Sequence, residues 1–124
     1  MTDNSITYLT DAVQITVVAQ RGRADDILKA CRDLGATGGV VFLARGTGAR
    51  ERLGLLGIAV EAEKEVVTVV VPADVRDLVA EAVYRAGGLN VPGGGYLYVS
   101  AIERLATYIP EDTLARLAQA DSDD

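Results

Sequence analysis

Two short runs of consecutive apolar residues lie on either side of a charged, glycine-containing segment in the middle of the chain. Residues 40–44 read Val-Val-Phe-Leu-Ala, and residues 66–71 are all valine except Thr68. Runs of this length and composition are typical of buried strands. Between them, residues 45–52 read Arg-Gly-Thr-Gly-Ala-Arg-Glu-Arg. We therefore expect two buried strands joined by a mobile functional loop.

The hydrophobic pattern predicts further elements on both sides of this unit. Apolar side chains recur at helical spacing in residues 24–34, where they are Ile27, Leu28, Cys31 and Leu34. Residues 74–86 carry a second apolar face, formed by Val75, Leu78, Val79, Ala82 and Val83. The expected elements are strands at 13–19, 38–44, 58–71 and 96–102, helices at 24–34 and 74–86, and a short terminal helix at 111–118.

This order, β-α-β-β-α-β, predicts an α+β fold of the ferredoxin-like type, with two helices on one face of an antiparallel sheet. We expect one such domain over residues 12–109. Residues 1–11 are expected to be a flexible N-terminus, apart from Tyr8 and Leu9. Residues 110–124 are expected to form the short helix and an acidic tail.

Apolar and polar residues do not alternate in these two runs, which indicates that several copies of the chain assemble. A sheet that helices cover on one face should alternate apolar and polar residues, but residues 40–44 and 66–71 are apolar on both faces. Two helices cannot cover both faces, so we expect other copies of the chain to bury the second one. The alternative is a monomer with an exposed apolar sheet.

Composition narrows the class of function. The 124 residues fit one domain, and a net charge of −6 argues against nucleic-acid binding. The chain has no histidine and one cysteine, so we expect neither a metal site nor a catalytic site. The single Cys31 excludes an internal disulfide and fits a reducing compartment. No signal-peptide pattern or membrane-spanning run is evident, and a cytoplasmic protein without direct membrane insertion is expected.

Several motifs, taken together and in order, resemble the P-II signal-transduction family and its P-II-like relatives. They are Ala-Asp-Asp-Ile-Leu at 24–28, the glycine-containing strand at 35–48, Val-Val-Pro at 70–72 and Gly-Gly-Gly-Tyr-Leu-Tyr-Val at 93–99. The resemblance covers residue 13 to about residue 108. It implies a ferredoxin-like homotrimer that binds adenine nucleotides between subunits. It also implies a T-loop, between the second and third strands, that controls a transporter or enzyme in nitrogen regulation or carbon metabolism.

The resemblance also implies site residues. The nucleotide-binding candidates are Gly46, Thr47, Gly48, Arg50, Gly93, Gly94, Gly95 and Tyr96, and the partner-binding loop candidates are Arg45, Arg52, Leu55 and Leu56. Glycines let the backbone approach an anion, and arginine can hold phosphate through two hydrogen bonds. The alternatives are that the glycines form a plain turn and that the arginines belong to a solvated loop.

The chain also departs from the family's pattern. Tyr96 stands where the family usually has lysine, and the paired arginines beyond the last strand fall near Thr107 and Ile109. The T-loop looks short, and residues 49–64 contain no Tyr or Ser for modification. We therefore expect a non-enzymatic regulator that requires no cofactor and favours ADP or AMP over ATP as effector. The alternatives are a scaffold trimer with a decayed cleft and a small trimeric enzyme.

Overall fold

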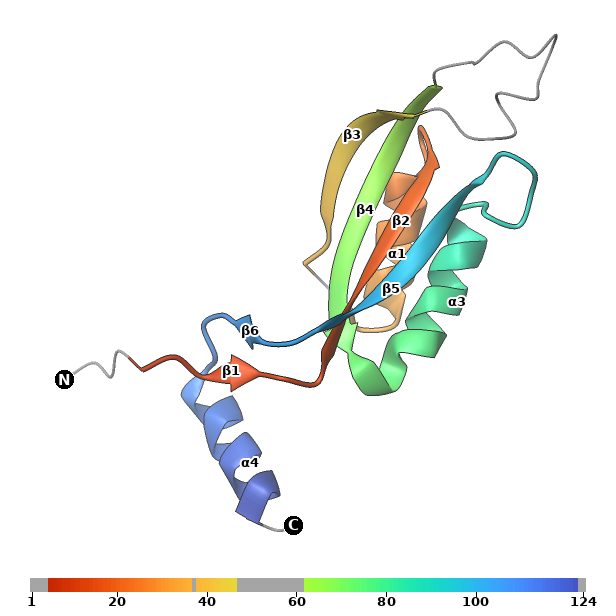
Figure 1. Cartoon of the computed structure of the whole chain (residues 1–124). Coiled ribbons are helices and arrows are strands. Elements are labelled where there is room, and N and C mark those ends of the chain that lie inside the picture. The colour runs from red at the N-terminus through yellow and green to blue at the C-terminus, as the bar shows by residue number, and fades with distance from the viewer. Residues whose placement is uncertain (1–4, 37, 47–61, 123–124) are drawn as a thin grey trace, which may run out of the picture.

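The computed structural model describes residues 5–36, 38–46 and 62–122. Its centre is a four-stranded antiparallel sheet with the strand order β3-β4-β2-β5, and α1 and α3 lie on one face (Figure 1). The strands are β2 (Ala12–Gln20), β3 (Val40–Gly46), β4 (Ala62–Pro72) and β5 (Gly95–Ile102), and the helices are α1 (Ala24–Asp33) and α3 (Arg76–Ala86). This is the predicted ferredoxin-like arrangement.

The boundaries differ from the prediction in places. β3 spans residues 40–46 rather than 38–44, because Gly38 has a φ of +84° and the strand continues opposite the start of β4. The predicted helix start at 74 lies in a 3₁₀ turn, η2 (Ala73–Val75), which precedes α3. In the predicted strand 58–71, residues 58–61 lie outside the described residues.

The core lies between the sheet and the two helices. Alternate residues of β2 and β4 face the helices and are buried, among them Ile15 and Val69, which are cross-strand partners. Ile27 of α1 and Val83 of α3 complete this layer, and both are fully buried. Two residues of the predicted helix faces do not belong to it, because Leu34 is 40% exposed and Leu78 is 56% exposed.

The prediction of a buried strand at 40–44 is wrong for the single chain. β3 is an edge of the sheet, and its apolar residues are exposed on both faces: Val40, Val41, Phe42 and Leu43. Leu43 and Ala19 are both cross-strand partners of Glu65, so they lie on the same face of the sheet. Ala19 is buried, whereas Leu43 is 69% exposed. The two helices therefore do not extend over this edge.

A second, two-stranded sheet lies beyond the far end of the main one. β1 (Tyr8–Leu9) pairs with β6 (Leu105–Ala106), and α4 (Glu111–Ser122) follows (Figure 1). The guanidinium of Arg104 lies over the Tyr8 ring, 4.7 Å from its centroid. Tyr8 and Leu9, the two residues excepted from the expected flexible N-terminus, thus form a strand whose partner lies near the other end of the sequence.

Candidate functional site

The glycine motifs of the sequence lie at one end of the main sheet. In the antiparallel order, β3 ends where β4 begins, and β2 ends where β5 begins (Figure 1). Gly46 and Gly95 therefore share an end but occupy opposite edges, with β4 and β2 between them. Three inter-strand spacings of about 4.8 Å separate them by about 14 Å across the strands, and the register offsets them further along the strands, because Gly46 lies opposite Ala62 and Gly95 is level with Glu65. Within one chain they do not form a single compact site.

The glycine loop, defined here as residues 87–95, connects α3 to β5 in a crowded conformation. A Cβ on Gly94 would lie 2.1 Å from the carbonyl oxygen of Gly88, and one on Gly95 would lie 2.0 Å from that of Val18. Gly93 and Gly95 have φ values of +75° and +119°. The fold itself therefore requires glycine at 94 and 95, whatever the loop binds.

The amides of the glycine loop are partly committed to the loop itself. The Gly94 N–H donates to the Val91 carbonyl, with an N···O distance of 3.0 Å. The amides of Gly87, Gly88 and Leu89 donate to carbonyls of α3 at 2.8, 3.2 and 3.1 Å. An anion at this loop therefore needs donors other than these four amides.

Two side chains from the end of β2 and the turn after it lie against the glycine loop. Gln20 donates from Nε2 to the Gly93 carbonyl at 2.9 Å. The guanidinium of Arg23 lies so close to Gly88 that a Cβ there would be 3.1 Å from Arg23 Cζ. Neither residue is among the predicted site residues. Pairing of the first and last strands, which the predicted fold contains, is the signal that could have found them, because it brings the two strand ends together.

Acidic side chains of β4 bind Arg21 and the backbone of the turn between β2 and α1. Arg21 Nη1 lies 2.5 Å from Glu63 Oε2, and the Gly22 N–H donates to Glu65. Arg45, a predicted partner-binding residue, is opposite Glu63 across the β3–β4 pair. At this part of the sheet end, Glu63 therefore lies next to two basic residues, Arg21 and Arg45.

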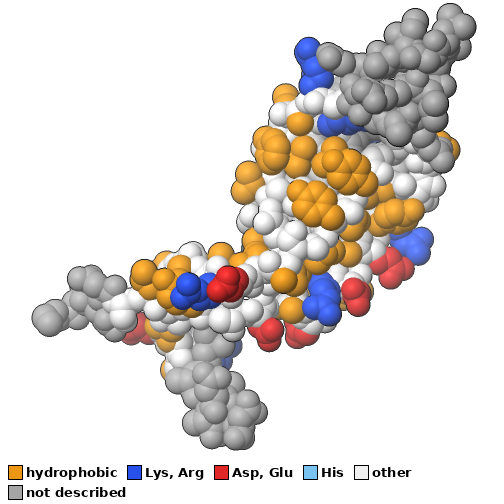
Figure 2. Space-filling model, in the orientation of Figure 1, with side chains coloured by type: hydrophobic (Ala, Val, Ile, Leu, Met, Phe, Trp, Pro, Cys, Tyr) orange, Lys and Arg blue, Asp and Glu red, His pale blue; other side chains and the backbone are white. Residues whose placement is uncertain are grey.

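The face of the sheet away from the helices carries an apolar surface. One cross-strand row consists of Phe42, Val66, Val18 and Tyr96, in the order β3, β4, β2, β5. Figure 2 shows hydrophobic side chains gathered over this face. Phe42 is 49% and Tyr96 59% exposed, and the Tyr96 ring stacks on Tyr98 with centroids 6.5 Å apart. We call this surface, together with Val40, Val70 and Tyr98, the open face.

The remaining predicted site residues have varied positions. Gly46 ends β3 with an ordinary negative-φ backbone, and a Cβ there would meet only Lys64 Cγ, at 3.9 Å. Tyr96 lies on the open face. Several predicted residues lie outside the described residues: Thr47, Gly48, Arg50, Arg52, Leu55 and Leu56.

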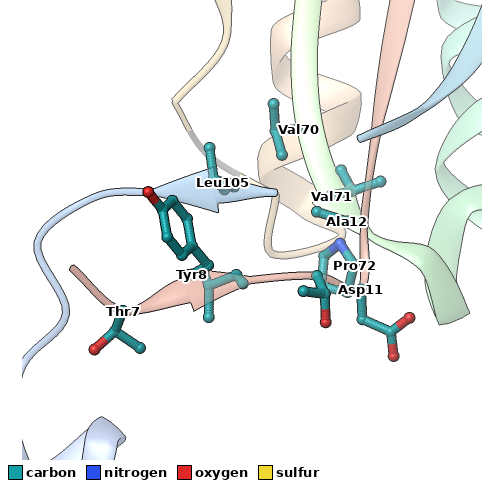
Figure 3. Close-up of a pocket in the computed structure, with 10 residues that line it drawn as sticks. Thr7, Tyr8, Asp11, Ala12, Val70, Val71, Pro72 and Leu105 are labelled. Carbon is teal, nitrogen blue, oxygen red and sulfur yellow. The ribbon is translucent and has the colours of Figure 1, made fainter. Parts of the chain in front are cut away.

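A pocket of about 570 Å³ lies at the opposite end of the sheet, between β1, β6 and the end of β4 (Figure 3). Tyr8, Leu105 and Val70 are among its lining residues, and no predicted site residue is. Over the described ranges, no three Cys, Asp or Glu side chains are grouped so that they could hold a metal ion. In the same ranges, no helix has the length and apolar character needed to cross a membrane.

The comparison with solved structures agrees with this architecture. No family model matches the chain, and no curated protein matches it either. Among solved structures, GlnK of B. subtilis in complex with ATP matches with a TM-score of 0.62. The chain has a P-II-like fold. The match to GlnK, a P-II protein, covers 74% of this chain and 82% of that one, at 18% sequence identity, and the likeness is one of fold.

Proposed function

We propose that this protein is a non-enzymatic, P-II-like regulator that acts in the cytoplasm as a homotrimer. It senses ADP or AMP in clefts between subunits and controls a protein partner through the segment between β3 and β4. The observation that carries the proposal is that the glycine loop, Gly46 and the start of β4 lie at the same end of a P-II-like sheet. The likeness to GlnK, which was solved with ATP, supports a nucleotide as effector.

The trimer is supported by the open face. Aromatic and β-branched side chains cover the face of the sheet that lies away from α1 and α3, and Phe42 and Tyr96 lie at the two edges of the row. Burial of apolar surface contributes about 25 cal/mol per Å², so copies that pack these faces together gain stability. Assembly also provides a way to bring Gly46 of one copy near Gly95 of another, which one chain cannot do.

The preference for ADP or AMP follows from the small number of unpaired cations near the glycine loop. Tyr96 provides no charge, Arg21 is paired with Glu63, and Arg104 lies at the other end of the sheet over Tyr8. A charge-assisted hydrogen bond contributes about 1.5–3 kcal/mol, so each phosphate without a cation costs ATP affinity. ADP and AMP present fewer charges that need such partners.

Calorimetry with ATP, ADP and AMP, combined with light scattering at micromolar concentration, tests the proposal. We expect a trimer that binds ADP or AMP at least as tightly as ATP. A monomer would overturn the assembly and the cleft between subunits. Clearly tighter binding of ATP would overturn the effector preference.

A scaffold trimer with no functional nucleotide site is the second candidate. The observation that favours it is that Gly94 and Gly95 are required by close backbone contacts, and that the Gly94 amide is already bonded to Val91. A trimer that binds none of the three nucleotides would support this candidate over the sensor.

A further inference from the structure

We propose that Arg23 is the phosphate-binding cation of the glycine loop, and this inference rests on the proposed function. It concerns adenine nucleotides with at least one phosphate and, as the minimal ligand, pyrophosphate. The guanidinium of Arg23 belongs to the turn between β2 and α1, yet it lies against the backbone of Gly88 in the α3–β5 connection.

The charge of Arg23 is available to a ligand. Within the described ranges its guanidinium makes no ion pair, although Asp25 and Asp26 follow it closely in the sequence. The neighbouring Arg21 differs, because Glu63 neutralises it. A guanidinium has five N–H donors in a planar fork that matches two phosphate oxygens.

The glycine loop carries no side chain at residue 88, where the guanidinium of Arg23 approaches it. Gly88 has a φ of +69°, and a Cβ on it would lie 3.1, 3.2 and 3.3 Å from Cζ, Nη2 and Nε of Arg23. A side chain at residue 88 would therefore crowd the guanidinium and require it to shift by a few tenths of an ångström. The carbonyl of Gly88 in turn touches the Cα side of Gly94, so Arg23 is positioned on the compact centre of the loop.

Half of the backbone N–H groups of the glycine loop are not available to an anion. The amides of Gly87, Gly88, Leu89 and Gly94 already donate to carbonyl oxygens. A phosphate here therefore needs side-chain donors as well, and Arg23 is a cation that the fold brings onto the loop. Gln20 contacts the same loop closer to β5, by donating a hydrogen bond to the Gly93 carbonyl.

The test measures ADP, adenosine and pyrophosphate binding by calorimetry to the full-length protein and its Arg23→Ala variant. We expect ADP and pyrophosphate affinity to fall about tenfold or more, because a charge-assisted bond is lost. Adenosine has no phosphate, and its affinity should not change. Arg21→Ala is the matched control from the same turn, and it should change ADP affinity by less than about threefold, since Arg21 is already paired.

A double-mutant cycle adds a readout of the contact itself. Gly88→Ala should weaken ADP binding by displacing Arg23, so adding it to Arg23→Ala should cost little more. Gly35→Ala is its control, because Gly35 has a similar φ of +82° and nothing within 4 Å of its Cβ position. Additive effects would contradict a shared mechanism.

The outcomes separate this inference from the proposed function. If ADP binds and Arg23→Ala changes nothing, or weakens adenosine equally, the role of Arg23 is overturned while the nucleotide sensor stands. If pyrophosphate binds through Arg23 but no nucleotide does, the role of Arg23 is supported and the proposed effector is overturned. If neither binds, both are overturned.

Discussion

The Cα of Gly95 lies against the carbonyl oxygen of Val18, so closely that a Cβ would be 2.0 Å from that oxygen. This contact forms where β5 begins to pair with β2, at the sheet end that carries the glycine loop. The backbone, rather than any ligand, demands the glycine. The contact also fixes the point at which the glycine loop joins β5.

Gly95→Ala should therefore destabilise the protein by about 2 kcal/mol or more, since it combines a strained φ with a backbone clash. Gly22→Ala is the matched control. Gly22 has a φ of +95° but nothing within 4 Å of its Cβ position, so we expect only the strain cost of about 1 kcal/mol. Urea denaturation measures both. Equal losses would show that crowding at Val18 is unimportant.

Phe42→Asp should dissociate the assembly, because it places a charge in the open face at the proposed subunit contact. Leu43→Asp is the control on the same strand, since Leu43 points to the opposite face and is even more exposed. Sedimentation should give a lighter species for the first variant only, with circular dichroism confirming that both are folded. Dissociation by both variants, or by neither, would contradict the open face as the interface.

Gln20→Ala should loosen the glycine loop by removing the hydrogen bond to the Gly93 carbonyl. An exposed bond of this kind contributes about 0.5–1.5 kcal/mol, so the global stability should fall only slightly. Hydrogen exchange of the amides at 93–95 should become faster. Gln14→Ala, which removes a longer bond to Thr16 at 3.4 Å, should leave exchange in the loop unchanged. Unchanged exchange in both variants would contradict a holding role for Gln20.

Burial raises the pKa of the Cys31 thiol above its ordinary value of 9.0. The reactive thiolate is therefore rare at neutral pH, and iodoacetamide should label the folded protein much more slowly than the protein unfolded in urea. Because the folded state holds the thiol proton more tightly, stability from this group is full below pH 9.0 and declines as the pH rises through the raised value. Cys31→Ala should remove that part of the decline. Equal labelling rates in both states would contradict the burial of Cys31.

The sequence by itself determined the order of strands and helices, because apolar spacing distinguishes a period of 3.6 from extended runs. The sequence also indicated that the two helices leave one apolar face of the sheet uncovered. The open face confirms this, because Phe42 and Tyr96 are exposed on it. The prediction from sequence failed for β3, which is exposed on both faces in the single chain. An apolar run predicts burial in some assembly, but it does not specify which partner supplies the cover.

Only the tertiary structure decided which distant residues meet. The pairing of Tyr8 with Ala106, and the approach of Arg23 to Gly88, join segments that no local pattern connects. Local spacing reports which face of an element is apolar, whereas these contacts depend on how the elements are placed relative to one another. The glycine loop illustrates the difference: its composition suggested an anion cradle, but the fold uses Gly94 and Gly95 for close backbone packing and leaves the available charge on Arg23.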